Sequence, residues 1–374
     1  MADDLSILSI QRIARLTPLA EILSVVETQT RPVAVQKWPV AAAFGCVVAE
    51  DVVASGPVPP APIAFCDGYA VDSGVFADAG PYSPVALPAA ARQVDAGDAL
   101  PRGCDAVLPV DAVMLRGGRI EAVAPVTPWA GVLTAGDDAT PRTPLRSAGE
   151  RLRAHDIAAI AAAGVEDVAI RAPRVHLVAA GSRTPVINAT RVMLARFIAA
   201  AGGAAVKDAD TLDAALADRN ADMIVAVGGT GRGRNDGSVR SLARLGNVTA
   251  HGIAVSPGET AAFGFVDARP VLLIPGRLDA ALAVWLLIGR HIIARLAGGK
   301  VREAPVMLPL KRKVTSAIGL TEVVPVTCAG GMAEPLGSGY LSFESLARSD
   351  GWIVIPADSE GLAAGTPIAV RRWP

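Results

Sequence analysis

The residues best suited to chemistry lie in a glycine-rich stretch, residues 223–237. Five apolar residues, 223–227, run into a turn that has glycine at positions 228, 229, 231 and 233. Glycine permits unusual backbone angles and lets backbone N–H groups come close to an anion. Arg232 and Arg234 add positive charge, and Asp236 adds a carboxylate that could hold a cation or a proton. The stretch predicts either an anion-binding loop or a glycine-rich surface turn whose charges are only solvated. It is neither a dinucleotide-binding fingerprint nor a P-loop, because the required spacing and the Lys-Ser/Thr pair are missing.

A second carboxylate, Asp67, lies directly before Gly68 and after a proline-rich approach. A carboxylate in such a turn can be presented to a functional site. It can equally cap the backbone of its own turn, which is the common role of Asp before Gly. The local sequence leaves both readings open.

Residues 173–298 show the alternation of strands and helices that would position the glycine-rich turn. Apolar runs at 175–180, 223–227 and 271–274 predict strands, and segments 191–201, 212–218, 239–245 and 278–296 predict helices. Such alternation is typical of a parallel sheet with helices on both faces. The carboxyl ends of parallel strands lie at one edge, where α/β proteins bind ligands. We therefore expect the turns at Gly181, Gly228 and Pro275 to form one pocket, together with the turn at 256–260.

The segments before residue 173 and after residue 298 have different patterns of apolar residues. Apolar spacing predicts helices in residues 5–30 and again within 128–172, and we expect these helices to pack together. Residues 40–127 consist of short β-like runs divided by Pro and Gly, and residues 301–374 predict a small β-barrel or sandwich.

The composition bounds the class of protein. The chain has 374 residues, 51% of them hydrophobic and 19% charged, with a formal net charge of -1. Scattered Lys and Arg at this net charge argue against nucleic acid or an anionic membrane as partner. The four cysteines contain no CxxC pair and the four histidines form no zinc motif, which is typical of a reduced, cytoplasmic protein.

Several motifs together resemble the molybdopterin molybdenumtransferase family of molybdenum cofactor biosynthesis. The family's Asp-Gly-Tyr-Ala-Val signature is similar to Asp67–Val71, and its Leu-Pro-x-Gly-x-Asp-Ala-Val stretch to Leu100–Val107. The molybdopterin-binding loop resembles residues 228–236, and the C-terminal signature resembles residues 337–356. Each motif alone is weak, but the set follows the family order over nearly the whole chain. We therefore identify the chain as a somewhat degenerate member of this family.

The resemblance implies a multidomain α/β fold. Its parts would be a discontinuous helical linker domain (1–39 and 128–172), a β-rich insert domain (40–127), a three-layer α/β/α molybdopterin-binding domain (173–300) and a C-terminal β-barrel (301–374). It further implies an elongated homodimer with the site between subunits.

The implied activity is insertion of molybdate into adenylylated molybdopterin with release of AMP, aided by a divalent cation such as Mg²⁺. Asp67 and Asp236 would be the catalytic and metal-binding carboxylates. A molybdoenzyme would be the recipient of the product, and neither nucleic acid nor membrane is an expected partner. The substrate-binding positions that the resemblance implies are Gly181, Ser182, Asn188, Gly228, Gly229, Thr230, Gly231, Arg232, Gly233, Ser256, Pro257, Gly258, Pro275 and Gly276.

The sequence departs from the family pattern in the turn after the first strand of the α/β domain. The family has Gly-Asp-Glu-Leu there, whereas Gly181 is followed by Ser182-Arg183-Thr184-Pro185. Other family positions in the pocket have lost positive charge. Four arginines could restore it: Arg183, Arg232, Arg234 and Arg277. An alternative function is a non-catalytic molybdopterin-binding accessory protein or chaperone for a molybdoenzyme. A third is a dimeric interaction protein that has lost the pocket, but the retained glycine-rich loop with Asp236, and Asp67, argue against it.

Overall fold

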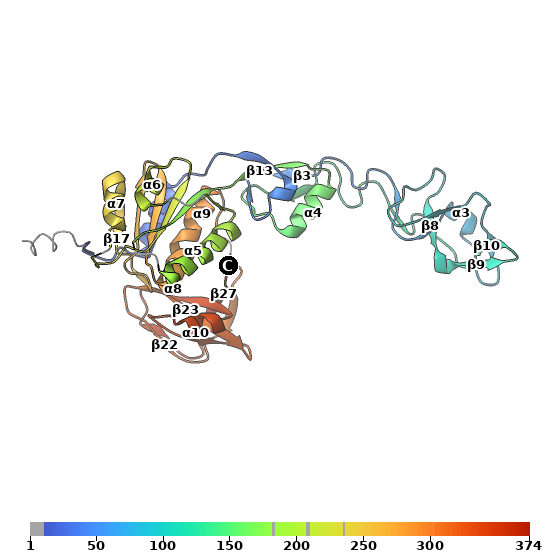
Figure 1. Cartoon of the computed structure of the whole chain (residues 1–374). Coiled ribbons are helices and arrows are strands. Elements are labelled where there is room, and N and C mark those ends of the chain that lie inside the picture. Colours follow the sequence, from blue (N-terminus) through green and yellow to red (C-terminus); the bar gives the residue numbers. More distant parts are fainter. Residues whose placement is uncertain (1–10, 182–183, 207–209, 235, 302) are drawn as a thin grey trace, which may run out of the picture.

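A six-stranded sheet forms the centre of the fold (Figure 1). The computed structural model describes residues 11–181, 184–206, 210–234, 236–301 and 303–374. The strands lie in the order β15 (Ala204–Ala205), β14 (Arg174–Ala179), β16 (Met223–Val227), β20 (Arg269–Ile274), β19 (Ala262–Val266) and β17 (Asn247–His251). The predicted strands at 175–180, 223–227 and 271–274 are confirmed as β14, β16 and β20.

The prediction of a parallel sheet is wrong for the half of the sheet that contains β19 and β17. β15, β14, β16 and β20 are parallel, whereas β19 runs antiparallel to both β20 and β17. β19 and β20 are joined by only two residues, Asp267 and Ala268, and Asp267 has a φ of 54°. So short a connection can only form a hairpin, because a parallel crossover needs a dozen or more residues.

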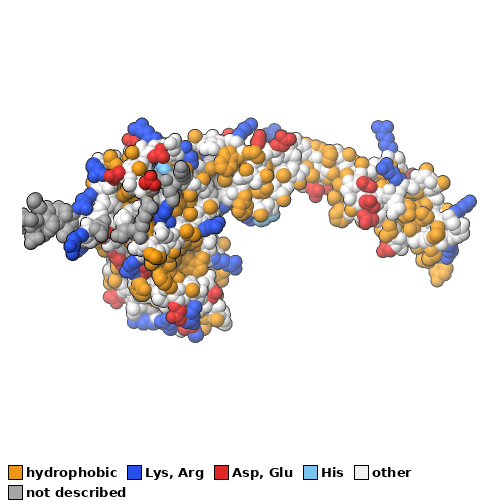
Figure 2. Space-filling view, viewed as in Figure 1, with side chains coloured by type: hydrophobic (Ala, Val, Ile, Leu, Met, Phe, Trp, Pro, Cys, Tyr) orange, Lys and Arg blue, Asp and Glu red, His pale blue; other side chains and the backbone are white. Residues whose placement is uncertain are grey.

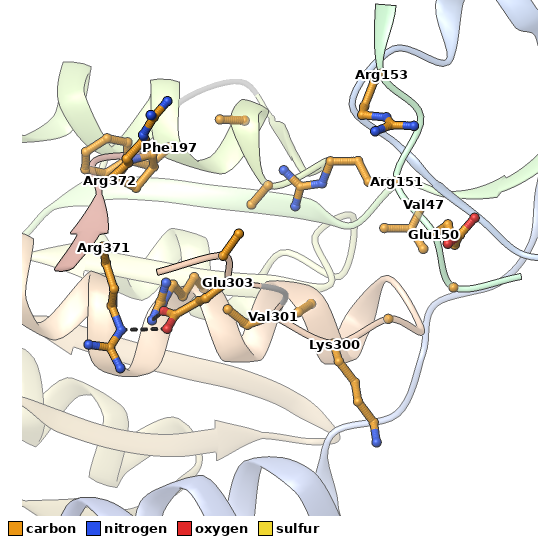
Figure 3. A pocket seen from close by; sticks show the side chains of 18 of the residues that line it. Val47, Glu150, Arg151, Arg153, Phe197, Lys300, Val301, Glu303, Arg371 and Arg372 are labelled. Carbon is orange, nitrogen blue, oxygen red and sulfur yellow. Dashed lines mark hydrogen bonds and ion pairs between the residues drawn. The ribbon is translucent and has the colours of Figure 1, made fainter. Parts of the chain in front are cut away.

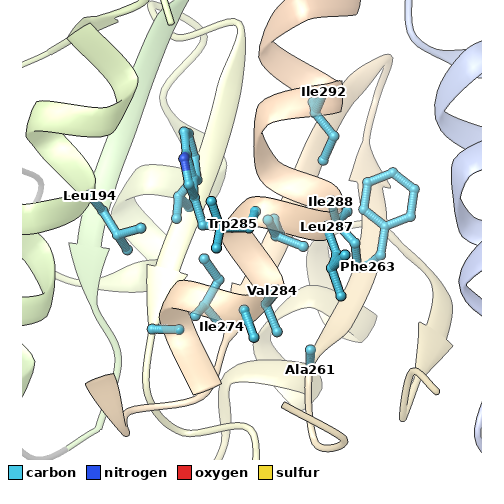
Figure 4. Packing of buried hydrophobic residues seen from close by; sticks show 14 of the residues in the cluster. Leu194, Ala261, Phe263, Ile274, Val284, Trp285, Leu287, Ile288 and Ile292 are labelled. Carbon is cyan, nitrogen blue, oxygen red and sulfur yellow. The ribbon is translucent and has the colours of Figure 1, made fainter. Parts of the chain in front are cut away.

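Helices cover both faces of this sheet. Side chains of neighbouring residues in β16 point to opposite faces, so Val225 belongs to the larger core and Ile224 and Ala226 to the smaller one. The larger core packs against α2 (Leu19–Gln29), α5 (Pro185–Ala200), α8 (Leu278–Val284), a π-helical turn at Trp285–Gly289 and α9 (Arg290–Leu296), and the smaller against α6 (Leu212–Ala217) and α7 (Ser238–Leu245). Figure 4 shows Trp285, which is 1% exposed, and Ile288 among the residues that fill the larger core.

The N-terminal segment differs from the predicted helical entry. Residues 1–10 lie outside the described part of the chain, and residues 11–18 form no helix. α2 begins directly after Pro18, which takes the N-cap position with φ -55° and ψ 140°. Its buried residues, Ile22 and Val26, pack into the large core of the α/β domain. The expectation that this helix packs with the helical part of 128–172 is therefore wrong.

The predicted helical linker contains more strand than helix. β1 (Gln36–Pro39), β13 (Asp167–Arg171) and β2 (Val47–Val48) form an antiparallel sheet in that order. A single helix of nine residues, α4 (Ala154–Ala162), packs on it around a separate core that includes Ile160 and Ile170. Residues 128–153 are not helical, because Pro and Gly recur there at 128, 131, 136, 141, 144 and 149.

The β-rich insert forms the far end of a long arm (Figure 1). β5 (Gly68–Val71) lies between β7 (Arg92–Val94) and β8 (Ala106–Pro109), and β10 (Arg119–Ala122) lies between β6 (Val85–Ala86) and β9 (Val113–Arg116). The small core of this end includes Phe76 and Leu108, which are 1% and 0% exposed. The arm holds this unit far from the central sheet.

The C-terminal segment forms a second six-stranded sheet below the central one in Figure 1. Leu310, which follows β21 (Val306–Pro309), bridges to Ala333 of β24 (Met332–Pro335), and the backbone N–H of Lys311 donates to the Ala333 carbonyl over 2.8 Å. The strands at the two ends of the sheet therefore approach each other. The sheet runs β18 (Val255–Ser256), β23 (Thr321–Ala329), β25 (Gly351–Ile355), β27 (Pro367–Arg372) and β21 (Val306–Pro309), with β24 (Met332–Pro335) also paired to β23.

The surface carries no single-sign charge field on the face that Figure 2 shows. Lys/Arg and Asp/Glu side chains are interspersed along the body and the arm. Within the described residues, no helix is both long enough and apolar enough to cross a membrane.

Candidate functional site

The turns that follow β14, β16 and β20 meet at the carboxyl edge of the central sheet. Gly228 lies against the backbone of Ala180: a Cβ atom at position 228 would be 2.4 Å from the Ala180 carbonyl oxygen. Gly276 lies beside Gly228, since a Cβ atom at position 276 would be 3.5 Å from the Gly228 Cα. Gly181 and Gly228 also have φ angles of 86° and 97°, which favour glycine. The structure thus brings Gly181, Gly228, Pro275 and Gly276 to one edge.

The loop after β16 presents several unpaired backbone donors. The N–H groups of Gly229, Thr230, Gly231 and Arg232 donate to no described residue. Consecutive free N–H groups in such a turn form a concave site for an anion. Gly229 has a φ of 72°, but Gly231 and Gly233 do not have positive φ angles. Only Gly228 and Gly229 therefore use the left-handed region that was expected for the whole loop.

Asp236 closes the loop from its carboxyl end. Its Oδ2 atom accepts a hydrogen bond from the Gly233 N–H over 2.7 Å, and its own N–H donates to the Gly233 carbonyl over 3.0 Å. A Cβ atom at position 231 would be 2.7 Å from the same Oδ2. The Oδ1 atom accepts no hydrogen bond from the described residues. Asp236 thus shapes the loop with one oxygen and leaves the other available.

Gln11 ties this loop to helix α7, and nothing in its local sequence indicates that role. Its side chain is buried at 5% exposure, and its Nε2 donates to the carbonyls of Gly229 and Gly231, each over 3.0 Å. Its Oε1 accepts from the backbone N–H groups of Val239 and Arg240 over 2.9 and 3.2 Å. The N–H groups at the start of α7 are therefore occupied, so the free donors for an anion are those of the loop.

The turn at 256–260 meets the loop through a different residue from those expected. The Thr260 and Thr230 hydroxyls lie 3.0 Å apart, and His251 Nε2 lies 3.0 Å from the Thr230 carbonyl. Ser256 is 6% exposed and pairs with the C-terminal sheet as part of β18. Gly258 packs against α8, because a Cβ atom there would lie 2.6 Å from Val284 Cγ2. These contacts place Ser256 and Gly258 where the C-terminal sheet and α8 meet, and Thr260 is the residue of this turn that contacts the loop.

The start of α5 supplies a further side of the edge. Ser182 lies outside the described residues. Thr184 caps α5, since its hydroxyl accepts from the Ile187 N–H over 3.3 Å. Asn188 is exposed in the first turn of this helix.

Arg277, in the turn after β20, is already engaged. Its Nε donates to Asp279 Oδ1 over 3.1 Å, and this bond raises the pKa of the guanidinium. Its Cζ lies 5.1 Å from the centre of the Tyr340 ring. Arg232 and Arg234 are exposed, and of the candidate arginines that the structure describes these two are open to a ligand. Arg183 lies outside the described residues.

Asp67 is far from this edge in a single chain. It is exposed directly before β5, on the arm, and its Oδ1 accepts from the Ala96 N–H over 2.8 Å (Figure 1). That hydrogen bond ties Asp67 to the turn after β7, 29 residues further along the chain, rather than to its own Asp-Gly turn. Asp67 and Asp236 are therefore not brought together within one chain.

No complete metal site is formed by this chain alone in its described part. There, no three His, Cys, Asp or Glu side chains group closely enough to hold an ion. Asp236 is the carboxylate that stands beside the free N–H groups of the loop. A cation at this edge would need further ligands from a bound molecule or from another chain.

Comparison with known proteins assigns the family. Residues 17–164 match the MoeA N-terminal region (domain I and II), residues 187–295 a probable molybdopterin binding domain, and residues 307–373 the MoeA C-terminal region (domain IV). Molybdopterin molybdenumtransferase 1 of Mycobacterium tuberculosis is 29% identical and covers 88% of this chain and 85% of its own length. Molybdopterin molybdenumtransferase of Synechococcus elongatus is 24% identical over 93% of this chain and 97% of its own length.

A solved structure agrees with these matches. The molybdopterin biosynthesis MoeA protein of Pyrococcus horikoshii is 26% identical and superposes with a TM-score of 0.70, covering 96% of this chain and 99% of that one. Three kinds of match indicate the same family: three family regions along the chain, relatives matched over most of their length, and a common multidomain fold. The chain belongs to the MoeA family of molybdopterin molybdenumtransferases.

Proposed function

We propose that this protein is a molybdopterin molybdenumtransferase that inserts molybdate into adenylylated molybdopterin and releases AMP. The observation that carries the proposal is the glycine-rich loop at the carboxyl edge of the sheet, in a chain whose relatives are named for this activity. Its free N–H groups suit a phosphate, and two exposed arginines stand beside them. The reaction needs such a cradle, because a phosphoryl group is held while AMP leaves.

The residues of the loop have different proposed roles. We infer that the N–H groups of Gly229, Thr230 and Gly231 hold a phosphate, and that Arg232 balances its charge. Asp236 fits a Mg²⁺ ion, because this ion is usually bound by one or two carboxylates together with substrate phosphates. When bound, the ion would neutralise charge on the phosphoryl oxygens. Gln11 and Thr260 hold the loop in shape.

We infer that a second copy of the chain completes the site. Asp67 lies at the end of the arm, so it can reach an Asp236 only if the arm of one copy extends to the body of another. This supports an elongated homodimer with two equivalent sites. We further propose that the C-terminal strands close as a small barrel and that the protein acts in the cytoplasm, where it passes its product to a molybdoenzyme.

The test is AMP release from adenylylated molybdopterin in the presence of molybdate and Mg²⁺. We expect release that depends on molybdate, and restored nitrate reductase activity when the gene complements a transferase-null strain. Tight molybdopterin binding without AMP release would overturn the enzyme and leave the accessory-binding function. No feature of the described residues favours that alternative.

Gly231→Val is expected to weaken molybdopterin binding by at least about tenfold, which is about 1.4 kcal/mol. The reason is not a positive φ at this position: the new Cβ would collide with Asp236 Oδ2 at 2.7 Å and displace it. Calorimetric titration measures the effect. Gly56→Val, at a position with no positive φ and nothing within 4 Å of its Cβ position, is the matched control outside the loop. An unchanged affinity in a folded Gly231→Val protein would remove the loop from the binding site.

Gln11→Glu is expected to lower the affinity for the same ligand by at least about tenfold. Glutamate keeps an acceptor for the Val239 and Arg240 N–H groups, but it places a negative charge against the Gly229 and Gly231 carbonyls. Gln36→Glu, at an exposed position in the linker, is the control. If Gln11→Glu binds as tightly as the unmodified protein, Gln11 has no part in shaping the loop.

A further inference from the structure

A large cavity lies away from the glycine-rich loop, where the base of the arm meets the body. Its volume is about 600 Å³, and residues 146–153, the end of α5, helix α9, residues 299–301 and 303–305 and the end of β27 line it (Figure 3). Small-molecule sites commonly have volumes of about 300 to 1,000 Å³. None of its lining residues belongs to the loop 228–237 or to the turn 256–260. The cavity is therefore a separate candidate site.

The cavity is strongly cationic. Seven of its lining residues are Arg or Lys, whereas two are Glu. Glu303 is engaged by Arg371, whose Nε lies 2.6 Å away, and by Arg290. Glu150 accepts from Arg146 over 3.3 Å. Both acids are thus already paired, and the excess of positive charge remains.

Arg151 and Arg372 are two of the cavity's cations that no carboxylate balances. Neither side chain makes an ion pair or a hydrogen bond with the described residues. In Figure 3 they come from opposite sides of the cavity, Arg151 from the segment after β12 (Pro144–Arg146) and Arg372 from the end of β27. Desolvation by the surrounding protein lowers the pKa of Arg151. Both residues are exposed, so an anion that enters the cavity can reach their guanidinium groups.

An apolar wall lies beside these charges. Phe197 is half-buried, and together with Ala200 and Ala201 it forms the α5 side of the cavity. Val301 and Pro305 add apolar surface from the segment that follows α9. A flat ring can pack against such a wall while a charged group reaches the arginines. The cavity thus combines the two surfaces that a phosphorylated ring compound requires.

We propose that this cavity is a second ligand site, which binds a phosphorylated heterocyclic compound of nucleotide size. Arg151 and Arg372 hold the phosphate, and Phe197 contacts the ring. Guanidinium groups suit this role because they bind phosphate oxygens in pairs. A ligand here contacts both residues 146–153 at the base of the arm and the C-terminal strand β27. The proposal does not depend on the activity proposed above.

The test is equilibrium dialysis with AMP as the probe, in a Gly231→Val background that weakens the loop as a competing site. We expect binding of AMP by this protein, and a loss of at least about tenfold in affinity for Arg151→Gln with Arg372→Gln. Arg116→Gln with Arg119→Gln, on the exposed β9–β10 hairpin, should leave the affinity unchanged. Adenosine, which lacks the phosphate, should bind at least about tenfold more weakly than AMP.

Three results would overturn the proposal. One is no AMP binding by the background protein, and another is equal binding by the double arginine variant. The third is equal affinity for AMP and adenosine, which would assign recognition to the ring alone. Arg151→Lys with Arg372→Lys separates charge from folding: it should recover part of the affinity, whereas a folding defect would persist. If AMP does not bind in this cavity, the proposed AMP release at the glycine-rich loop is unaffected. The cavity and the transferase activity are therefore tested independently.

Discussion

Asp236→Asn is expected to reduce AMP release by about a thousandfold, which corresponds to about 4 kcal/mol of transition-state stabilisation. The substitution keeps an oxygen that can accept the Gly233 N–H, so the loop should retain its shape. It removes the negative charge that would hold a Mg²⁺ ion against the phosphate oxygens. Binding of molybdopterin should survive, because neutral backbone N–H groups hold its phosphate.

The comparison is made by measuring AMP release and molybdopterin affinity in parallel. Asp267→Asn is a matched control, because this exposed turn residue has a φ of 54°, a conformation that Asn tolerates well. Retained AMP release in Asp236→Asn would exclude the metal role of this carboxylate. Loss of both release and binding would show instead that Asp236 acts by shaping the loop.

The local sequence predicted the centre of the fold well. The strands β14, β16 and β20 are continuous apolar runs that end in Gly or Pro, and such runs are typical of strands buried on both faces. The meeting of the turns after these strands at one carboxyl edge then followed from the rule for α/β sheets. The direction of β19 was not foreseen, since it depends on a two-residue hairpin whose turn lacks Gly.

Long-range contacts account for what the sequence could not predict. Gln11 lies 218 residues from Gly229, and no periodicity or motif connects them. Helix α2 has an amphipathic pattern that predicts a buried face, but the pattern does not say which core receives Ile22 and Val26. The cationic cavity likewise joins residues near 150, 197, 300 and 372, which become neighbours only in the folded chain.

The position of Asp67 leads to the second large effect. Within one chain, Asp67 on the arm and Asp236 at the sheet edge lie far apart, yet the resemblance assigns both to one site. If the arm of one copy reaches the body of the other, each of two equivalent sites takes one carboxylate from each chain. A dimer of Asp67→Ala chains then lacks the arm carboxylate in both sites, and a dimer of Asp236→Ala chains lacks the loop carboxylate in both. Each variant alone should therefore release little AMP.

A mixed dimer of the two variants separates this arrangement from a site built by a single chain. One of its sites would combine an intact Asp236 with an intact Asp67, and the other would lack both, so purified mixed dimers should release AMP at about half the rate of the unmodified dimer. Co-expression with two different affinity tags isolates these dimers, and light scattering confirms their mass. Mixed dimers as inactive as the single variants would show that the two carboxylates do not meet across an interface. A single-chain mass at micromolar concentration would reject the dimer itself, and full activity of Asp67→Ala alone would remove Asp67 from the chemistry.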